Sequence, residues 1–350
     1  MKKCLSLIAT SIATLMILCA SPLPATAQDD PAASLFSLPV DCTLDKDCWL
    51  VNYVDVDPSA GALDYQCGTR SYDNHNGTDI AIPDYVSMQS GVNVLAAADG
   101  IVLRLRDSVA DWPPITDDED AAKKRADIRA KNQDCGNGVF IEHDNGYTGI
   151  YCHMKKDSIA VKVGQKVKRG EILGQVGMSG FTEFPHLHFG IYKDGKTIDP
   201  FTRHTSADGC DKPKNPLWDA TFPRDDYKLV SFFGGGFKNH VPDFDALAID
   251  ISPPDSIAID SDIFTFWIGM YGVRADDQIK IEIRGPDNRL YLKKMIAQKN
   301  DKARQYYFVG KKTANDPLQA GYYGGYVQLT RTGPDGNRFS ADYSTTIKVE

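Results

Sequence analysis

A series of short apolar runs separated by glycine-containing turns, from about residue 66 to residue 205, constrains the fold most strongly. The stretch GVFIEHDNGYTGIYCHM (138–154) alternates apolar and polar residues on both sides of the turn DNG (144–146). This pattern predicts a β-hairpin. Residues 93–105 and 159–177 read as further short strands, the former joined at an Asp-Gly turn. We therefore expect a mostly β fold with a compact antiparallel sheet.

A charged segment interrupts the strands at residues 107–135. Within it, residues 117–132 favour a helix, and Gly136 lies just past the end of that helix. We interpret the segment as an insertion between two strands with a solvated charged face. A role in gating substrate is the alternative.

Four further parts are expected along the chain besides a leader. Residues 28–65 are polar and punctuated by proline, which indicates an extended segment before the domain at 66–205. Residues 206–239 resemble a linker. Residues 240–350 contain strands at the spacing of an immunoglobulin-like β-sandwich. This last region has one histidine, His240, and no catalytic cluster. Its aromatic residues favour a structural core, with glycan or protein binding as the alternative.

Residues 1–27 have the features of a cleaved signal peptide. A basic pair (2–3) precedes the apolar run LSLIATSIATLMILCA (5–20), and ATA (25–27) is a small-x-small cleavage pattern. A membrane anchor fits less well, because the run is short for a span and proline follows it. Lipidation of Cys19 fits less well because a bulky residue precedes it. We expect an exported protein, periplasmic rather than secreted or associated with the cell wall.

Charge and cysteine content narrow the class of protein further. Removing the two leader lysines takes the formal net charge from −8 to −10, which argues against nucleic acid and anionic membranes as partners. Six cysteines remain after the leader, and an even number in an exported chain indicates disulfides. A thiolate zinc site is the alternative, but no CxxC pair occurs. The remaining cysteines are Cys42, Cys48, Cys67, Cys135, Cys152 and Cys210.

Proximity in the sequence suggests two of the cysteine pairings. Cys42 and Cys48 are close enough to close a small loop, and Cys135 and Cys152 flank the predicted hairpin. The connectivity as a whole stays open, because six cysteines allow 15 pairings.

The stretch FPHLHFG (184–190) places two histidines on one short apolar segment. Residues two apart project from the same face of a strand, so His186 and His188 share a face while Leu187 and Phe189 face the core. A pair of half-exposed histidines is the simpler interpretation of this motif alone. Its meaning therefore depends on partners elsewhere in the chain.

Two other segments supply such partners. HNGTD (75–79) carries His75 and Asp79, with Gly77 allowing a tight turn between them, and YCHM (151–154) carries His153 on the hairpin. Imidazole and carboxylate are good zinc ligands, and catalytic zinc sites commonly use three protein ligands and one water. His75, Asp79 and one histidine of the HxH pair make such a set. Two histidines are then left for proton transfer.

At these motifs the chain resembles the lysostaphin-type, or LytM-like, zinc metallopeptidases, which carry HxGxD, a later YxH and a terminal HLHF. The supporting stretches are VLAAADGIV (94–102), GNGVFIEHDNGY (136–147), GQKVKRGEILGQVGMSG (164–180) and IDPF (198–201). The resemblance covers about residues 66–205.

The resemblance implies a function and a role for each site residue. It implies that His75, Asp79 and His188 bind one Zn²⁺ and that His153 and His186 are the catalytic pair. It also implies a groove over the metal and, as substrate, the peptide cross-links of bacterial cell-wall peptidoglycan. The alternatives are a non-catalytic wall-binding or amidase-activating protein of the same fold, or another zinc hydrolase acting on wall peptides.

Departures from the family pattern concern substrate preference. Gly190 follows HLHF where the family frequently has Glu, and the insertion at 107–135 is longer than usual. Phe181, Glu183 and Phe184 stand before PHLHF where smaller residues are common. None of these changes removes a proposed ligand.

Overall fold

The computed structural model describes residues 35–112, 118–220, 222, 227–333 and 336–350. The described chain is mostly β with antiparallel pairing nearly throughout, as the sequence predicted. The expected signal peptide at 1–27 lies outside these residues. None of the described helices is long and apolar enough to cross a membrane.

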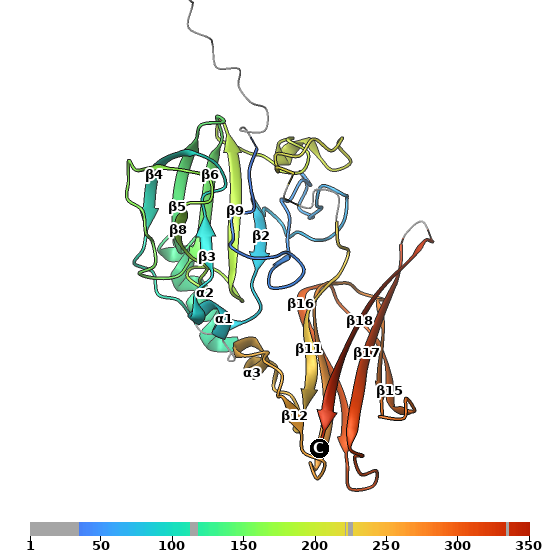
Figure 1. Ribbon diagram of the computed structural model, residues 1–350. Helices are drawn as coiled ribbons and strands as arrows, with labels where there is room; N and C mark the ends of the chain where they lie inside the picture. Colours follow the sequence, from blue (N-terminus) through green and yellow to red (C-terminus); the bar gives the residue numbers. More distant parts are fainter. Residues whose placement is uncertain (1–34, 113–117, 221, 223–226, 334–335) are drawn as a thin grey trace, which may run out of the picture.

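The N-terminal region is built on an eight-stranded sheet in the order β1-β2-β9-β6-β5-β4-β7, with β10 paired to β9 (Figure 1). Its strands are β1 (Trp49–Leu50), β2 (Thr78–Ala81), β4 (Gly100–Arg106), β5 (Asn137–His143), β6 (Thr148–Met154), β7 (Lys166–Val167), β9 (His186–Lys193) and β10 (Lys196–Thr197). A separate two-stranded sheet pairs β3 (Asn93–Leu95) with β8 (Ile172–Gln175). The predicted hairpin is confirmed as β5 and β6. The two strands predicted at 93–105 also form, as β3 and β4, but they belong to different sheets.

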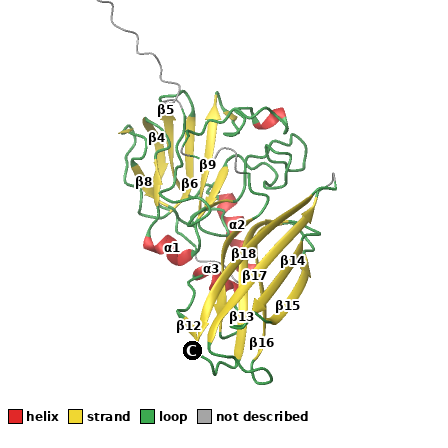
Figure 2. Cartoon of the chain, turned by 45° about the vertical axis from the view of Figure 1, so that its right-hand side comes forward, coloured by secondary structure: helices red, strands yellow, loops and turns green. Residues whose placement is uncertain are grey.

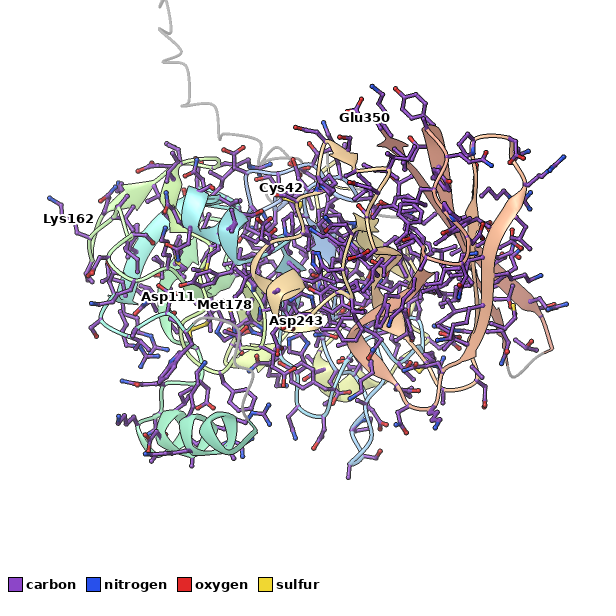
Figure 3. All side chains as sticks on the ribbon, turned by 90° about the horizontal axis from the view of Figure 1, so that it is seen from below. Cys42, Asp111, Lys162, Met178, Asp243 and Glu350 are labelled. Atoms are coloured by element: carbon purple, nitrogen blue, oxygen red, sulfur yellow. A yellow bond between two sulfur atoms is a disulfide. The ribbon has the colours of Figure 1, made fainter. Side chains whose placement is uncertain are left out.

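The described residues contain three α-helices and one 3-10 helix. These are α1 (Tyr85–Ser90), α2 (Asp118–Ala130), α3 (Phe244–Ile249) and η1 (Ser206–Asp208). Helix α2 lies between β4 and β5, which confirms a helical insertion between two strands. Figure 3 shows this helix standing out from the body of the molecule.

The C-terminal region consists of two sheets (Figure 2). One pairs β11 (Ser231–Lys238), β13 (Ile263–Val273) and β16 (Lys302–Lys312). The other has the order β12-β18-β17-β14-β15. Its strands are β12 (Ser256–Ile257), β14 (Gln278–Arg284), β15 (Leu290–Ala297), β17 (Gly321–Thr332) and β18 (Arg338–Val349). The immunoglobulin-like topology stays a prediction, as do the domain boundaries, although β11 falls within the range expected to be a linker.

Three buried apolar clusters hold these sheets together. One fills the N-terminal region and includes Phe36 and Tyr53 of the segment that the sequence suggested was merely extended. A second lies between the two C-terminal sheets. A third joins the regions, with Trp49 and Phe184 from one side and Tyr271 from the other. The N-terminal segment therefore contributes to the core of the sheet that carries the predicted site.

Three disulfides are present. The pairings Cys42–Cys48 and Cys135–Cys152 are confirmed. The third bond joins Cys67 to Cys210 across 143 residues, a separation that the sequence could not connect. Disulfides of this number are typical of proteins outside the reducing cytoplasm.

Candidate metal centre and active-site cleft

The register of three neighbouring strands brings the predicted site residues together. Asp79 on β2 lies opposite His188 on β9, and His188 lies opposite Cys152 on β6. Leu187 and Phe189 are fully buried in the core. Because side chains alternate along a strand, His186 and His188 therefore project from the other face, as the sequence predicted.

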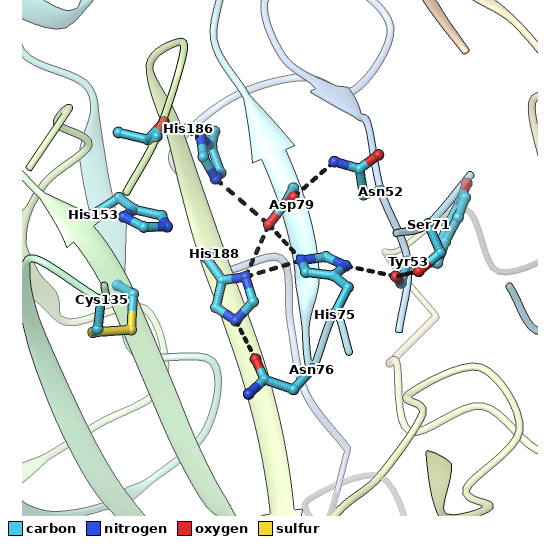
Figure 4. Close-up of polar contacts among 12 residues, drawn as sticks. Asn52, Tyr53, Ser71, His75, Asn76, Asp79, Cys135, His153, His186 and His188 are labelled. Atoms are coloured by element: carbon cyan, nitrogen blue, oxygen red, sulfur yellow. Dashed lines mark hydrogen bonds and ion pairs between the residues drawn. A yellow bond between two sulfur atoms is a disulfide. The ribbon is translucent and has the colours of Figure 1, made fainter. Parts of the chain in front are cut away.

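His75, Asp79 and His188 converge on one point (Figure 4). The Oδ1 atom of Asp79 lies 3.1 Å from Nε2 of His75 and 2.9 Å from Nδ1 of His188. The two imidazole nitrogens lie 3.1 Å apart. Asp79 and His75 are buried, and the side chain of His188 is 12% exposed.

The protons of this cluster point away from its centre. His75 Nδ1–H donates to the carbonyl of Tyr53 at 2.6 Å, which leaves a lone pair on Nε2. His188 Nε2–H donates to Oδ1 of Asn76 at 3.0 Å, which leaves a lone pair on Nδ1. Two nitrogen lone pairs and one carboxylate oxygen thus face each other in a buried space. Such a set of donor atoms can hold a cation, and imidazole with carboxylate suits zinc.

Gly77 is required for a different reason from the one that the sequence suggested. A Cβ atom built on it would lie 2.6 Å from Nε2 of His188. Its φ is not in the left-handed region. The glycine is therefore needed for close approach of the His188 ring rather than for a tight turn.

The segment at 28–65 supplies two groups that hold the ligands in place. Asn52 Nδ2 donates to Oδ2 of Asp79 at 2.9 Å, and Tyr53 supplies the carbonyl that orients His75. Hydrogen bonds of this kind fix the tautomer and direction of a metal ligand. Sequence reasoning missed both residues, because their role depends on how the chain around β1 lies against β2.

His153 and His186 stand beside the cluster, with ring centroids 4.7 Å apart. His153 Nδ1–H donates to the carbonyl of Ser179 at 2.9 Å, and His186 Nδ1–H donates to the carbonyl of Phe184 at 2.9 Å. Both rings therefore keep a free Nε2, and that of His186 lies 3.5 Å from Oδ1 of Asp79. His153 also has a φ of 62°, uncommon outside glycine and a feature that clusters at functional sites.

The electrostatics follow from burial and mutual proximity. Burial opposes ionisation of Asp79, but the imidazoles of His75 and His186 hold the pKa of that carboxyl well below its usual range. Burial opposes protonation of His75, yet Asp79 raises the pKa of this imidazole. Burial lowers the pKa of His188, and burial and then His186 lower the pKa of His153 well below its usual range. His153 is therefore a neutral base.

An open cleft of about 410 Å³ gives access to the cluster. His153 and His188 line it, together with Tyr72, Asn76 and Arg129. A peptide in this cleft would contact both a proposed ligand and a proposed catalytic histidine.

The C-terminal region packs against the segment that orients His186. The ring of Phe184 lies 5.8 Å from that of Tyr271, and the guanidinium of Arg304 lies 5.4 Å from the Phe184 ring. Arg304 also donates to the carbonyl of Pro83 at 3.2 Å. Because the Phe184 carbonyl accepts the Nδ1 proton of His186, this packing influences the position of that ring.

An open, buried His–Asp–His cluster beside two further histidines is the class of site that metal-dependent hydrolases use. Residues 121–200 match peptidase family M23. This match confirms the resemblance over that part of the chain. The matched residues include His153, His186 and His188, whereas His75 and Asp79 lie before them.

Curated relatives match a similar portion of the chain. The peptidoglycan DD-endopeptidase ShyA of Vibrio cholerae is 31% identical over 131 residues, which are 37% of this chain and 23% of the relative. The DD-carboxypeptidase/endopeptidase Mpg of Neisseria meningitidis is 28% identical over 126 residues, which are 36% of this chain and 22% of the relative. The chain thus spans about a quarter of the length of these relatives.

Solved structures are similar to a comparable share of the chain. A zinc-containing peptidase from Vibrio cholerae is 28% identical with a TM-score of 0.26, covering 43% of this chain and 39% of that one. The catalytic domain of the prophage-encoded M23 protein EnpA from Enterococcus faecalis is 27% identical with a TM-score of 0.26, covering 37% and 77%. At these TM-scores the solved structures carry no argument, and the resemblance rests on the sequence matches.

Proposed function

We propose that the protein is an exported zinc-dependent endopeptidase that hydrolyses the peptide cross-links of bacterial cell-wall peptidoglycan. The observation that carries this proposal is the convergence of His75, Asp79 and His188 in one buried cluster, beside the rings of His153 and His186. A non-catalytic protein has no need of this complete set. Three disulfides and a leader-like N-terminus support export to the periplasm.

In this proposal His75 Nε2, Asp79 Oδ1 and His188 Nδ1 hold one Zn²⁺ per chain. The ion supplies Lewis-acid activation of a water molecule and of the peptide carbonyl. The carbonyls of Tyr53, Ser179 and Phe184 keep the imidazoles in the required tautomers.

In this proposal His153 and His186 carry out the proton transfers. Each has an Nε2 lone pair directed toward the site, so each can accept the proton of the attacking water and pass it to the leaving amine. To donate a hydrogen bond to the developing oxyanion, the other ring would enter the reaction already protonated at Nε2, with that proton taken from solvent. Burial keeps His153 neutral, so its Nε2 is available to accept a proton, and the general base is not assigned to one of the two histidines.

The substrate is inferred from the relatives. ShyA is described as a peptidoglycan DD-endopeptidase, which favours a direct D-alanyl–diaminopimelate cross-link over an interpeptide glycine bridge. Carboxypeptidase activity is a second candidate, because Mpg is described as a DD-carboxypeptidase/endopeptidase. The two activities release products of different mass from the same wall material.

The test is digestion of peptidoglycan of defined cross-link chemistry, followed by mass spectrometry of the fragments. We expect cross-linked dimers to become monomers with zinc-loaded protein and to persist after chelation. His186→Ala should retain zinc and lose about 10²–10⁴-fold in rate, because it removes an acid–base group. His240→Ala, a change of an exposed histidine outside the site, is the matched control. Intact dimers with zinc-loaded wild-type protein on every cross-link type would refute the proposal.

A further inference from the structure

The insertion at 107–135 places a positively charged side chain, that of Arg129, at the rim of the active-site cleft. We propose that Arg129, in the last turn of α2, determines specificity by binding a carboxylate of the peptide substrate. This inference rests on the proposed function and adds the substrate class, a peptide with a free carboxylate close to the bond that is cut.

Both ends of the insertion are fastened to the sheet region. Before α2, the carboxylate of Asp111 accepts from the backbone N–H groups of Lys156 at 2.8 Å and Met178 at 2.7 Å (Figure 3). After α2, Cys135 forms a disulfide with Cys152. The carbonyl of Cys135 also accepts from the N–H of His153 at 2.8 Å. The helix is therefore tied directly to a proposed catalytic residue.

The side chains of α2 pack on the loop that precedes His186. The guanidinium of Arg129 lies 5.1 Å from the centre of the Phe181 ring, within range of a cation–π contact. The N–H of Phe181 donates to the carbonyl of Asp134 at 2.9 Å. Arg129, Phe181 and Asp134 all line the cleft with His153 and His188. These contacts hold the Arg129 guanidinium on the rim rather than away from it.

Arg129 and Arg125 lie one turn apart on the same helix and differ in two respects. Arg125 forms an ion pair with Glu183 at 3.0 Å and does not line the cleft. Arg129 is exposed and has no ion-pair partner among the residues that the structure describes. Its fork of N–H donors is thus available to a ligand, and its geometry matches a carboxylate with two parallel hydrogen bonds.

The rest of the cleft suits a polar peptide. Tyr72, Asn74, Asn76 and Tyr192 supply neutral hydrogen-bonding groups, and Asp134 is the acidic side chain among the lining residues. Arg129 is the lining residue that carries a permanent positive charge. A substrate carboxylate on this rim would therefore contact the guanidinium of Arg129, on the side of the cleft that the insertion forms.

The experiment compares two synthetic diaminopimelate-cross-linked stem dimers, one with free carboxylates and one with the same groups as carboxamides. For Arg129→Gln we expect KM for the carboxylate dimer to rise by roughly 10–100-fold, the range for losing a hydrogen bond to a charged group. The value of kcat, and both constants for the carboxamide dimer, should change little. Arg125→Gln is the matched control and should not alter the preference, while Arg129→Lys should restore part of it.

A binding measurement separates this inference from the proposed function. Calorimetry on zinc-loaded protein at a temperature where no cleavage is seen should show tighter binding of the carboxylate dimer, and loss of that preference in Arg129→Gln. If the wild type binds or cuts both dimers equally, Arg129 has no such role, whatever the enzyme's activity. If Arg129→Gln weakens both dimers alike, its role is structural and the inference is overturned. If the preference is present without cleavage, the proposed function fails and the carboxylate site stands.

Discussion

Two buried aspartates, one in each region of the molecule, have different kinds of partner for their carboxylates. In the C-terminal region, the Asp277 carboxylate meets Arg331, whose Nε and Nη2 donate to its two oxygens at 2.7 and 2.8 Å. In the N-terminal region, Oδ1 of Asp79 faces imidazole nitrogens whose protons point elsewhere. The first carboxylate is paired with a permanent cation of the protein, whereas in the proposed function the second carboxylate binds a metal ion.

The comparison separates a structural charge from a functional one. Burying a charge is tolerated only when it is paired, so the pairing partner shows what the site is for. The Asp277–Arg331 pair joins the start of β14 to the end of its neighbour β17. Asp79 has imidazoles and the Asn52 amide around its carboxylate but no guanidinium or ammonium partner among the described residues, which supports the proposal of a bound metal ion.

The largest expected effect comes from Asp79→Ala. Zinc content should fall from one ion per chain to near zero, and the cleavage rate should fall by more than about 10³-fold, because the metal supplies several kcal/mol of transition-state stabilisation. The stability of the metal-free protein should fall as well, because the variant removes the carboxylate that accepts from Asn52 and faces the imidazoles. Metal analysis, single-turnover assays and chemical denaturation provide the three readouts. If the variant retained one zinc ion per chain, Asp79 would not be a metal ligand and the contrast with Asp277 would fail.

Asp277→Ala should give the opposite profile. It leaves Arg331 buried without its partner, so the free energy of unfolding should fall by about 3–5 kcal/mol while bound zinc per folded chain is unchanged. Denaturant titration measures the loss. Replacing both residues by apolar side chains should recover part of it, and no recovery would argue that the pair does more than satisfy its own charges.

His143 is a buried histidine outside the site, and it can be compared with the site histidines in the same way. Its Nδ1–H donates to the carbonyl of Ala98 at 3.1 Å, and its Nε2 accepts from the Tyr151 hydroxyl at 3.1 Å, so both ring nitrogens have protein partners. Burial lowers the pKa of His143 to about 4. Because the unfolded value is about 6.5, the neutral ring contributes stability above that pH, and the contribution is lost as pH falls from about 6.5 to 4.

The corresponding measurement is the free energy of unfolding against pH for wild-type protein and His143→Gln. We expect up to about 3 kcal/mol of the wild-type decline between pH 6.5 and 4 to be missing in the variant. Parallel pH profiles would mean that His143 does not titrate in this window.

The smallest expected effect tests whether the C-terminal region supports catalysis. Arg304→Ala removes the guanidinium that contacts Phe184 and should lower kcat by roughly three- to tenfold, because small displacements of a catalytic group are costly. Zinc content and KM should stay the same. Arg289→Ala, an exposed change in a distant turn, is the control. An unchanged kcat would limit the role of this interface to stability.

The sequence predicted which residues converge at the site, but it did not predict the residues that hold them in place. The spacing of His186 and His188 on one strand determined which face they share, and the alternation around DNG determined the hairpin that carries His153. These are local rules. Asn52 and Tyr53 were missed because their role depends on the register between distant segments, and Cys67–Cys210 was missed for the same reason. The role proposed for Arg129 required seeing where the insertion ends relative to the cleft.

The most direct test of the metal centre is anomalous diffraction at the zinc edge from crystals of the zinc-loaded protein. The account predicts one strong peak at about 2.0–2.2 Å from Nε2 of His75, Oδ1 of Asp79 and Nδ1 of His188. A peak elsewhere, or a fully loaded crystal in which Asp79 does not touch the metal, would contradict it.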